Sequence, residues 1–351
     1  MDPVRLGVVG CGVIGPTHMA AAAESPLLEL VAVADLIEER ARAAAEKFKA
    51  RKVYRSGAEL VEDPEVEAVV LAFPTGKRTE LALRAFANGK HVLLEKPVAM
   101  NAAEVRQMIA AQGTLTAACC SSRFRFVQGA KVAADFIASG ALGELRVVRC
   151  RNIAAGGPKP TAPRPDWRLT RALNGGGYLV NWGCYDLDYL LGITGWTLRP
   201  RLVLAQTWTI PSQFRSHVAP CSDAETHYAA LIRCDGGTVI TLERGEYMAA
   251  HSEDAWQIVG TRGSLTLKMT WGSPKAVVHD DTAAEGGVAT RTLWEGEETG
   301  SLTSTGPVTD FAAAIREGRR PMTDLERALI LQQITDAIYA SARSGAGAAI
   351  D

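Results

Sequence analysis

The sequence predicts an α/β protein of two domains: a doubly wound parallel sheet, followed by an α+β domain whose sheet is mostly antiparallel. The chain has 351 residues, and domains average roughly 150 residues, so two domains are expected. Short β-branched runs alternate with alanine-rich helical stretches in residues 1–120. Closely spaced strand-like runs with turn residues dominate the remainder. We place the domains at residues 1–122 and 123–351.

Five apolar runs in the first domain have the length and composition of strands. They are Val4–Val9, Leu28–Ala34, Val66–Ala72, His91–Glu95 and Leu115–Cys120. Helical spacing lies between them in Leu36–Lys49, Thr79–Ala87 and Ala102–Ala111, with Asn101 expected as an N-cap and Gly89 as a helix stop. Strands that are apolar on both faces and separated by helices indicate parallel βαβ units.

Helices and a loop open the second domain. A helix is expected at Val127–Ser139 and a strand at Leu145–Arg151. A loop rich in glycine and proline, Ala154–Pro165, comes next. The run Asn174-Gly175-Gly176-Gly177 then opens a helix that reaches about Leu191.

Strands dominate the rest of the chain, and a turn at Asp235–Gly237 favours antiparallel pairing between them. The expected strands are Leu202–Thr209, Tyr228–Cys234, Thr238–Glu243, Trp256–Val259 and Ser264–Met269. A final helix is expected at Asp324–Ala342, and we expect it to pack back on the first domain.

Composition and charge argue against several classes of function. The 38 basic and 39 acidic residues give a net charge of −1, which provides no general attraction to nucleic acid or anionic membrane. No run of 18 apolar residues is present, so no segment is expected to span a bilayer. The apolar start is typical of a strand and turn and not of a signal peptide. Seven cysteines without a C-x-x-C pair, and no cluster with ligand spacing, indicate a reducing cytoplasm and no metal site.

A glycine fingerprint, Gly10-Cys11-Gly12-Val13-Ile14-Gly15, lies between the first strand and the helix that follows. Gly10 allows a tight turn, Gly12 lets a pyrophosphate approach the backbone, and Gly15 lets helix and strand pack closely. Backbone N–H groups at the start of the helix, including those of Val13 and Ile14, would bind the phosphates. The alternative is an ordinary glycine-rich turn, but the strand–turn–helix context favours a dinucleotide site.

Asp35 lies 20 residues after Gly15, at the end of the second strand. A carboxylate at this place accepts hydrogen bonds from the adenosine ribose hydroxyls. It would also repel a 2′-phosphate, by roughly 4 kcal/mol at about 4 Å and an effective dielectric near 20, which is an upper value. We therefore expect NAD and not NADP as the cofactor. The alternative is that Asp35 only caps the next helix.

Lys96 stands at the carboxyl end of a predicted parallel strand, in the run Gly89–Pro97. Open α/β sheets bind their ligands at this edge. Pro97 biases Lys96 towards an extended backbone, which would direct its side chain over the sheet edge. An ordinary lysine at a strand end is the alternative, and position alone does not separate the two.

These motifs together resemble the Gfo/Idh/MocA family of oxidoreductases. The resemblance rests on Gly10–Gly15, Asp35, Phe73-Pro74-Thr75, the run GKHVLLEKP, the helix opened by three glycines, and the closing YASARSG. It implies a Rossmann domain, a second domain with a large open sheet, and hydride transfer between nicotinamide and a secondary hydroxyl of a sugar, polyol or diol. It also implies that Pro74, Thr75 and Glu95 help to bind the cofactor, and that Lys96 is catalytic or orients the substrate. We further expect a homo-oligomer that forms through the open sheet face, because an uncovered sheet exposes apolar surface.

The sequence departs from the family pattern in the helix opened by the glycines. Family members commonly have an Asp and, four residues later, a His, where this chain has Asn181 and Tyr185. A 3.6-residue period places Tyr178, Asn181, Tyr185 and Asp188 on one face. We expect Tyr185 to remove the hydroxyl proton, with Lys96 orienting the substrate oxygen and lowering the pKa of Tyr185 from its usual value near 10. Asn181 would hold a substrate hydroxyl. The alternatives are that the tyrosines are ordinary buried aromatics, or that Lys96 or water is the base.

Weaker candidates lie outside these motifs. Trp167 and Arg168 would offer an aromatic platform and a hydroxyl donor to a sugar, and one of Arg123 and Arg125 would face the cleft unless both are solvated. His18 is expected to have a packing role, with a catalytic role as the alternative. His227 is a further candidate for a residue that lines the site.

We expect an NAD-dependent enzyme that oxidises a free sugar, a polyol or an intact glycoside to its keto form, releasing NADH or reusing it in place. Two other classes remain open. One is an enzyme that uses NAD transiently to cleave a glycoside without net redox change. The other is a dinucleotide-binding regulator without catalysis, since a fold does not determine a function.

Overall fold

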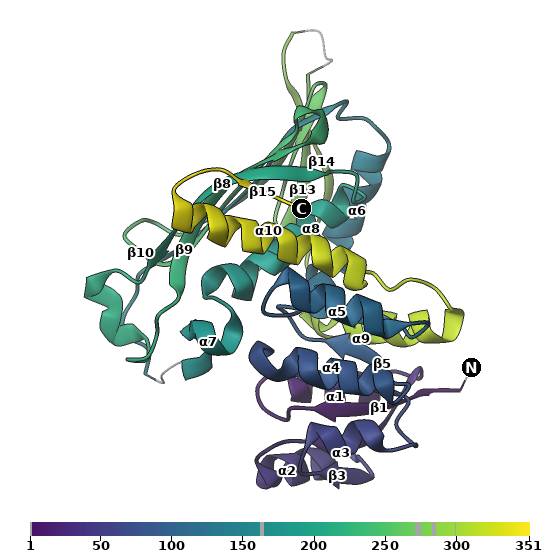
Figure 1. Cartoon of the computed structure of the whole chain (residues 1–351). Helices are drawn as coiled ribbons and strands as arrows, with labels where there is room; N and C mark the ends of the chain where they lie inside the picture. The colour runs from purple at the N-terminus through teal and green to yellow at the C-terminus, as the bar shows by residue number, and fades with distance from the viewer. Residues whose placement is uncertain (1, 162–164, 271–274, 283–285, 299) are drawn as a thin grey trace. The chain divides into compact units, whose positions relative to one another are not determined.

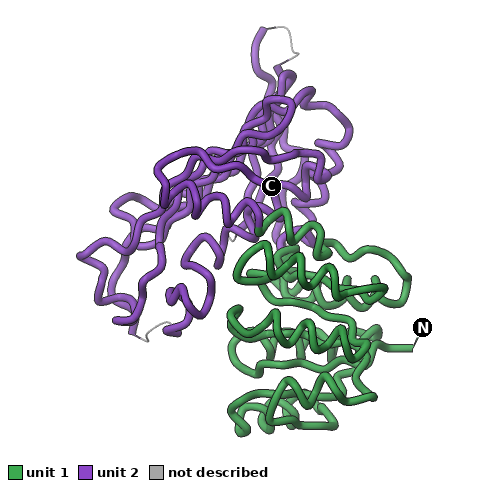
Figure 2. The backbone as a smooth tube through the Cα atoms, viewed as in Figure 1, with its two compact units in different colours: residues 1–123, 300–332 green, residues 124–299, 333–351 purple. Residues whose placement is uncertain are grey.

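The computed structural model describes residues 2–161, 165–270, 275–282, 286–298 and 300–351. The part of the predicted loop that falls at residues 162–164 lies outside this set. The chain divides into two compact units (Figure 2): unit 1 comprises residues 1–123 and 300–332, and unit 2 comprises residues 124–299 and 333–351. Unit 1 is therefore built from two separate segments of the chain. Among the described residues, no helix is both long and apolar enough to cross a membrane.

Unit 1 contains a six-stranded parallel sheet in the order β3-β2-β1-β4-β5-β6, flanked by helices (Figure 1). Its strands are β1 (Val4–Val9), β2 (Leu28–Ala34), β3 (Lys52–Tyr54), β4 (Ala68–Leu71), β5 (His91–Leu94) and β6 (Ala117–Cys119). Its helices are α1 (Gly15–Glu24), α2 (Glu38–Phe48), α3 (Gly57–Glu62), α4 (Arg78–Ala87), α5 (Ala102–Gln112) and α9 (Gly300–Glu317). The predicted doubly wound sheet is confirmed, and Asn101 caps α5 by accepting the N–H of Glu104. The strand β3 and the helix α3 were not predicted, because both are short and only partly apolar.

The two faces of this sheet carry separate apolar cores. On one face α9 contributes Val308, Phe311 and Ala312 to a cluster with residues of β1 and α1. On the other face Leu325 and Ala328, from the start of α10 (Leu325–Ser344), join residues of α4 and α5. The sequence did not predict α9, since glycine, serine, threonine and an internal proline lower its helix propensity. Its burial against the sheet compensates for that weakness.

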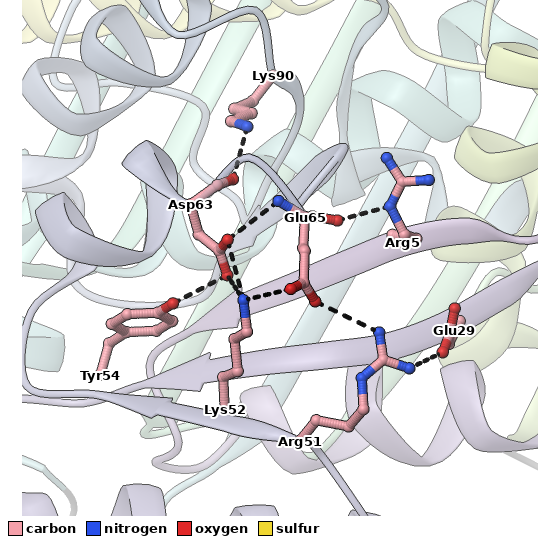
Figure 3. Close-up of polar contacts among 8 residues, drawn as sticks. All are labelled: Arg5, Glu29, Arg51, Lys52, Tyr54, Asp63, Glu65 and Lys90. Carbon is pink, nitrogen blue, oxygen red and sulfur yellow. Dashed lines mark hydrogen bonds and ion pairs between the residues drawn. The ribbon is translucent and has the colours of Figure 1, made fainter.

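A polar network centred on Asp63 connects several strands and loops of unit 1 (Figure 3). The carboxylate of Asp63 accepts hydrogen bonds from Lys52 Nζ at 3.0 and 3.1 Å, from Tyr54 at 2.8 Å and from the N–H of Glu65 at 3.0 Å. Lys90 is buried, and its ammonium donates to the backbone carbonyls of Asp63 and Val66. Because the members of this network bond to one another, its role is to hold the fold.

Unit 2 contains a nine-stranded sheet in the order β14-β13-β12-β11-β7-β10-β9-β8-β15 (Figure 1). Only β7 and β10 pair in parallel among its described strands, so the predicted, mostly antiparallel sheet is confirmed. The strands are β7 (Leu145–Ala155), β8 (Pro200–Thr209), β9 (Glu225–Cys234), β10 (Val239–Met248), β11 (Glu253–Gly260), β12 (Gly263–Leu267), β13 (Lys275–Asp281), β14 (Ala289–Gly296) and β15 (Ala348–Ala349). β7 runs past the predicted loop start at Ala154, because β10 continues to pair with its end, at Ala155.

One face of this sheet is packed and the other is open. Tyr228 and Ile232 of β9 are buried on the face that carries α8 (Cys184–Ile193), while Leu231 on the same strand is exposed. Leu204 of β8 lies directly opposite Leu231 and is exposed as well. A shallow groove of about 650 Å³ crosses this open face and includes both leucines. The helix α6 (Gln128–Ala138) completes the unit, as predicted from the sequence.

We predict that Asp63→Asn destabilises the protein in a pH-dependent way. Burial alone would raise the pKa of Asp63, but the hydrogen bonds from Glu65, Lys52 and Tyr54 hold it below its ordinary value of 3.8. The carboxylate therefore stabilises the fold above pH 3.8, and this contribution is lost as the pH falls through the lower folded-state pKa. At pH 7 the variant should lose about 1–3 kcal/mol in the free energy of unfolding by urea.

The difference between the wild-type protein and Asp63→Asn should shrink on acidification. Glu80→Gln, which neutralises an exposed carboxylate of the same unit, serves as the control and should change little. A difference that stays constant between pH 7 and pH 3 would contradict the role assigned to Asp63.

Candidate active site

The glycine loop of unit 1 has the backbone geometry of a phosphate-binding turn. Gly10 has a φ of +97°, and a Cβ there would lie 2.4 Å from the carbonyl oxygen of Ala72. A Cβ on Gly15 would lie 1.8 Å from the carbonyl oxygen of Gly10, so glycine is required at both ends of the loop. A Cβ on Gly12 would meet no atom within 4 Å. The middle of the loop therefore faces open space at the N-terminus of α1, where a phosphate group fits.

Asp35 is half-buried at the carboxyl end of β2 and holds this loop in place. Its Oδ2 accepts the N–H of Cys11 at 2.7 Å, and its Oδ1 accepts the N–H of Ile37 at 2.8 Å. The contact with Cys11 links the carboxylate to the glycine loop. The contact with Ile37 fits the alternative role of Asp35, which is to cap the next helix. Each oxygen can accept a further hydrogen bond, so both remain able to bind ribose hydroxyls. Burial and the charge of Asp35 raise the pKa of the Cys11 thiol to about 12, so the thiol stays protonated.

The loop after β4 and the turn after β5 are joined by Arg78, a residue that the sequence analysis missed. Pro74 precedes a short 3-10 helix at Thr75–Lys77, and Thr75 is fully buried. The buried guanidinium of Arg78 donates to the backbone carbonyls of Phe73, Glu95 and Pro97. The sequence does not distinguish Arg78 from a solvent-exposed arginine at a helix start, because the acceptors of these hydrogen bonds are backbone atoms and leave no side-chain motif.

Glu95 is the centre of a buried cluster at the carboxyl end of β5. Its Oε1 lies 2.9 Å from Nε2 of His18 and accepts a hydrogen bond from Arg123 at 3.0 Å. Its Oε2 accepts the backbone N–H of Lys96 at 3.0 Å. Burial would raise the pKa of Glu95, but Arg123, His18 and Lys96 hold it well below its usual range. The half-buried Lys96 thus follows directly on a buried carboxylate anion, and its peptide bond to Pro97 is cis.

This cluster also brings together three side chains of types that bind metals. One donor atom each from His18, Glu95 and Cys120 lies within 4.8 Å of the others. The guanidinium of Arg123 already contacts the same Glu95 oxygen as His18, which opposes a bound cation. Burial also raises the pKa of the Cys120 thiol well above its usual value, so a thiolate ligand is disfavoured. These side chains favour a hydrogen-bonded cluster over a metal site.

In unit 2, the glycine-rich run before α8 fits closely around a buried carboxylate. Oε1 of Glu225 accepts the N–H groups of Gly177 at 2.9 Å and Leu179 at 3.1 Å, and the hydroxyl of Tyr339 at 2.7 Å. A Cβ on Gly177 would lie 2.0 Å from the Glu225 carbonyl oxygen, and one on Gly176 would lie 1.9 Å from the Tyr339 hydroxyl. Glu225 therefore caps the helix start, and the glycines make that approach possible.

The helix itself differs from the predicted one. A π-helical segment at Leu179–Gly183 precedes α8, and it contains Asn181. A π-turn accommodates more residues than an α-turn, so the 3.6-residue period predicted for Tyr178, Asn181, Tyr185 and Asp188 does not hold across it. Asn181 is half-buried, whereas the other three are buried. Such π-segments occur often at functional sites.

Tyr185 is packed among aromatic side chains at the start of α8. Its ring lies 5.1 Å from that of Phe124 and 5.7 Å from that of Trp182, both with edge-on geometry. Farther along the helix, Asp188 pairs with Arg125 at 3.2 Å. The alternative that Arg125 is solvated is therefore wrong, because its side chain is largely buried in this ion pair.

A buried ion pair next to Tyr185 was not predicted. The guanidinium of Arg244 donates to both oxygens of Asp186, at 2.6 and 2.7 Å, and lies 4.8 Å from the ring centre of Trp182. Tyr228 and Asn152 supply further hydrogen bonds. Burial raises the pKa of Asp186, and Arg244 opposes that rise. The pair holds the first turn of α8, which also contains Tyr185, against β10.

The remaining candidates have partners of their own. Arg168 makes two hydrogen bonds to Glu246, at 3.2 and 3.1 Å, and lies 5.8 Å from the ring centre of Tyr178. Trp167 is half-exposed beside it. His227 stacks on Trp208 at 4.5 Å, on the open face of the sheet. Its neighbour Tyr228 instead faces α8, because successive residues of a strand point to opposite faces.

Comparison with known proteins identifies the family. Residues 4–119 match a family model described as "Oxidoreductase family, NAD-binding Rossmann fold", and residues 131–266 match the "GFO/IDH/MocA C-terminal domain". The chain belongs to the GFO/IDH/MocA family. The resemblance seen in the sequence is thereby confirmed, and so is NAD as the cofactor of this oxidoreductase.

Relatives in the family span most of the chain. The dTDP-3,4-didehydro-2,6-dideoxy-alpha-D-glucose 3-reductase of Streptomyces violaceoruber is 31% identical and covers 77% of this chain and 74% of its own. The trans-1,2-dihydrobenzene-1,2-diol dehydrogenase of Mus musculus is 29% identical, with 79% and 78% covered. A solved levoglucosan dehydrogenase in complex with NADH and levoglucosan has a TM-score of 0.85 at 22% identity, with 99% of both chains covered. That last likeness shows that the two proteins share the fold.

We predict that Arg244→Leu destabilises the protein by about 3–5 kcal/mol, because it leaves the Asp186 carboxylate buried without its cation. Urea unfolding followed by tryptophan fluorescence measures this loss. Arg233→Leu replaces an exposed arginine on the adjacent strand β9 and is the matched control, expected to stay within about 0.5 kcal/mol of wild type. Equal losses in the two variants would contradict the structural role given to the buried pair.

Proposed function

We propose that the protein oxidises a secondary hydroxyl of a sugar, polyol or intact glycoside to a ketone and transfers the hydride to NAD. The observation that carries this proposal is the place of Lys96, which follows the buried Glu95 at the carboxyl end of β5. The glycine loop lies at the carboxyl end of β1, at the same edge of the same parallel sheet. Open α/β sheets bind their ligands at that edge. Further support comes from relatives and a structural neighbour whose names specify a sugar, a diol or an anhydrosugar.

The proposed reaction divides the work between three side chains. Tyr185 removes the hydroxyl proton, Lys96 orients the substrate oxygen, and Asn181 holds a neighbouring hydroxyl. Tyrosine has an ordinary pKa near 10, and an ammonium group close to a phenol favours the phenolate. The glycine loop and Asp35 would hold NAD, which would supply a hydride acceptor for the carbon of the alcohol. The alcohol thus loses a proton from its oxygen to Tyr185 and a hydride from its carbon to the nicotinamide. The product is a ketone.

Other residues would shape the substrate site. We assign the aromatic face of Trp167 to contact with a sugar ring, and Arg168 to hydrogen bonding with its hydroxyls. Glu246 supports this role of Arg168, since two hydrogen bonds orient the guanidinium while other N–H groups stay available. The bond from Arg123 to Glu95 supports a place for Arg123 near Lys96 on the substrate side.

We also propose that the protein forms a homo-oligomer through the open face of unit 2. The exposed Leu204 and Leu231 on this face, and the groove between the strands, are the supporting features. Sedimentation of the intact protein is the test, and a monomer at all concentrations would reject this interface.

NAD should be preferred over NADP by two to three orders of magnitude in kcat/KM, because the Asp35 carboxylate repels a 2′-phosphate. Steady-state kinetics with both cofactors measure the preference. Asp35→Asn keeps the size of the side chain and removes its charge, so it should narrow the ratio mainly by improving the use of NADP. Comparable efficiency of the wild-type protein with both cofactors would defeat the assignment.

Anaerobic incubation with NAD and a panel of alcohols tests the reaction itself. We expect one of levoglucosan, glucose, a methyl glucoside, myo-inositol and trans-1,2-dihydrobenzene-1,2-diol to lose two daltons while NADH appears. Lys96→Ala should abolish this change, and Tyr185→Phe should slow it by about 10²–10⁴-fold, the usual contribution of a general base. Tyr54→Phe, which removes the hydroxyl that donates to Asp63, should leave turnover intact.

The outcomes separate the alternatives. Near-normal turnover of Tyr185→Phe would make Lys96 or water the base. Cleavage of a glycoside without NADH would favour the enzyme that uses NAD transiently. If the protein binds NAD but oxidises none of the alcohols, the result would favour the regulator. Cofactor that stays bound through purification would indicate that NADH is reused in place.

A further inference from the structure

One histidine connects the two parts of unit 1 that the proposed reaction uses. His18 is fully buried on α1, in the first turn after Gly15. Its Nε2 lies 2.9 Å from Oε1 of Glu95, and the other oxygen of Glu95 accepts the backbone N–H of Lys96. A single carboxylate therefore links the helix that begins at the glycine loop to the turn that carries the lysine.

We propose that His18 is a positioning residue that sets the place of Lys96 through Glu95. In this arrangement the helix that receives the dinucleotide phosphates and the turn that bears the lysine behave as one rigid element. The proposal rests on the proposed function, since it takes Lys96 as the group that orients the substrate. It assigns a task to His18 that packing alone does not require.

The polar contacts of His18 argue against a simple packing role. Nδ1 has no hydrogen-bond partner in the described part of the chain, so the imidazole is held by Nε2. A buried polar atom without a partner is costly, and an apolar side chain of similar size would avoid that cost. Hydrogen bonds to an ionised acceptor are short, strong and directional. The bond to Glu95 is the feature that an apolar residue would lose.

The backbone of the lysine turn is held separately. Arg78 donates to the carbonyls of Glu95 and Pro97, on either side of Lys96. Arg123 donates to the Glu95 oxygen that His18 also contacts. His18 is the member of this group that belongs to α1, so a displacement of the glycine-loop helix reaches Lys96 through it. Such a chain of direct contacts is a physical route for coupling between two sites.

Two amide substitutions separate the hydrogen bond from the packing of the ring. Glutamine places its side-chain nitrogen about as far from Cα as Nε2 of histidine, so His18→Gln can still donate to Glu95. Asparagine is shorter and reaches only the position of Nδ1, so His18→Asn cannot. Both variants remove the ring. His279→Asn is the matched control, because His279 is another buried histidine, on β13 of unit 2.

The first measurement is the reactivity of Lys96 and needs no substrate. Trinitrobenzenesulfonate modifies exposed amines, and peptide mass spectrometry gives the modification rate of Lys96 relative to the exposed Lys77. We expect His18→Asn to change this ratio by about threefold or more, because the amine loses its fixed position. His18→Gln and His279→Asn should keep the wild-type ratio.

The second measurement uses the panel alcohol that the wild-type protein oxidises. His18→Asn should lower kcat by about tenfold or more and leave KM for the alcohol nearly unchanged, and His18→Gln should restore most of kcat. Glu95→Gln should also lower kcat. The double variant His18→Asn/Glu95→Gln should be no slower than Glu95→Gln alone, since both changes break one link.

The results distinguish this inference from the proposed function. If His18→Asn keeps the wild-type labelling ratio of Lys96 and the wild-type kcat, the inference is overturned. If His18→Asn and His18→Gln lose equal amounts of kcat, the inference is also overturned, because the effect would then come from packing of the ring. Full turnover of Lys96→Ala would overturn the proposed role of the lysine, while the labelling ratio would still decide whether His18 positions it.

Discussion

The anionic Glu95 carboxylate, buried at the carboxyl end of β5, is the constraint on which the candidate site in unit 1 depends. A charge in the interior is tolerated only when donors surround it, and here they come from α1, from the segment after β6 and from the next peptide unit. Those donors bring together parts of the chain that lie far apart in the sequence. The acidic residue of the run GKHVLLEKP thus organises the site around the lysine, and Arg78 fixes the backbone on both sides of that lysine.

Unit 2 applies the same physical rule to a helix. Glu225 is buried, and its carboxylate accepts backbone N–H groups at the start of a helix and the Tyr339 hydroxyl, and it also pairs with Arg171 at 3.4 Å. Next to the π-segment, Arg244 and Asp186 form a second buried pair that is fully hydrogen-bonded. Along the chain, the half-buried Asn181 lies between these two hydrogen-bonded carboxylate sites. A site that must hold a hydroxyl in a defined orientation benefits from this rigidity.

Much of the fold could be predicted from local pattern, and the departures have physical reasons. β1 and β2 end where the sequence analysis placed them, because each is an apolar run followed by a turn or a helix start. By contrast, β3 is three residues long, and α9 has poor helix propensity and depends on burial against the sheet. The glycine loop and Lys96 were found because glycine and the EKP run have recognisable spacing. Arg78, Glu225 and Arg244 were missed because their partners are backbone atoms or residues far away in sequence, as with Tyr339, 114 residues beyond Glu225.

The discontinuity of unit 1 has a consequence for biosynthesis. Its parallel sheet is complete by residue 119, yet part of the cover of one face, including Phe311, belongs to α9, and Leu325 and Ala328 complete the other face. While the ribosome makes the intervening 176 residues, from 124 to 299, both faces of the sheet lack this later part of their native cover. The nucleotide-binding half of the nascent chain therefore reaches its final packing only near the end of translation, after the residues of the later half have already emerged.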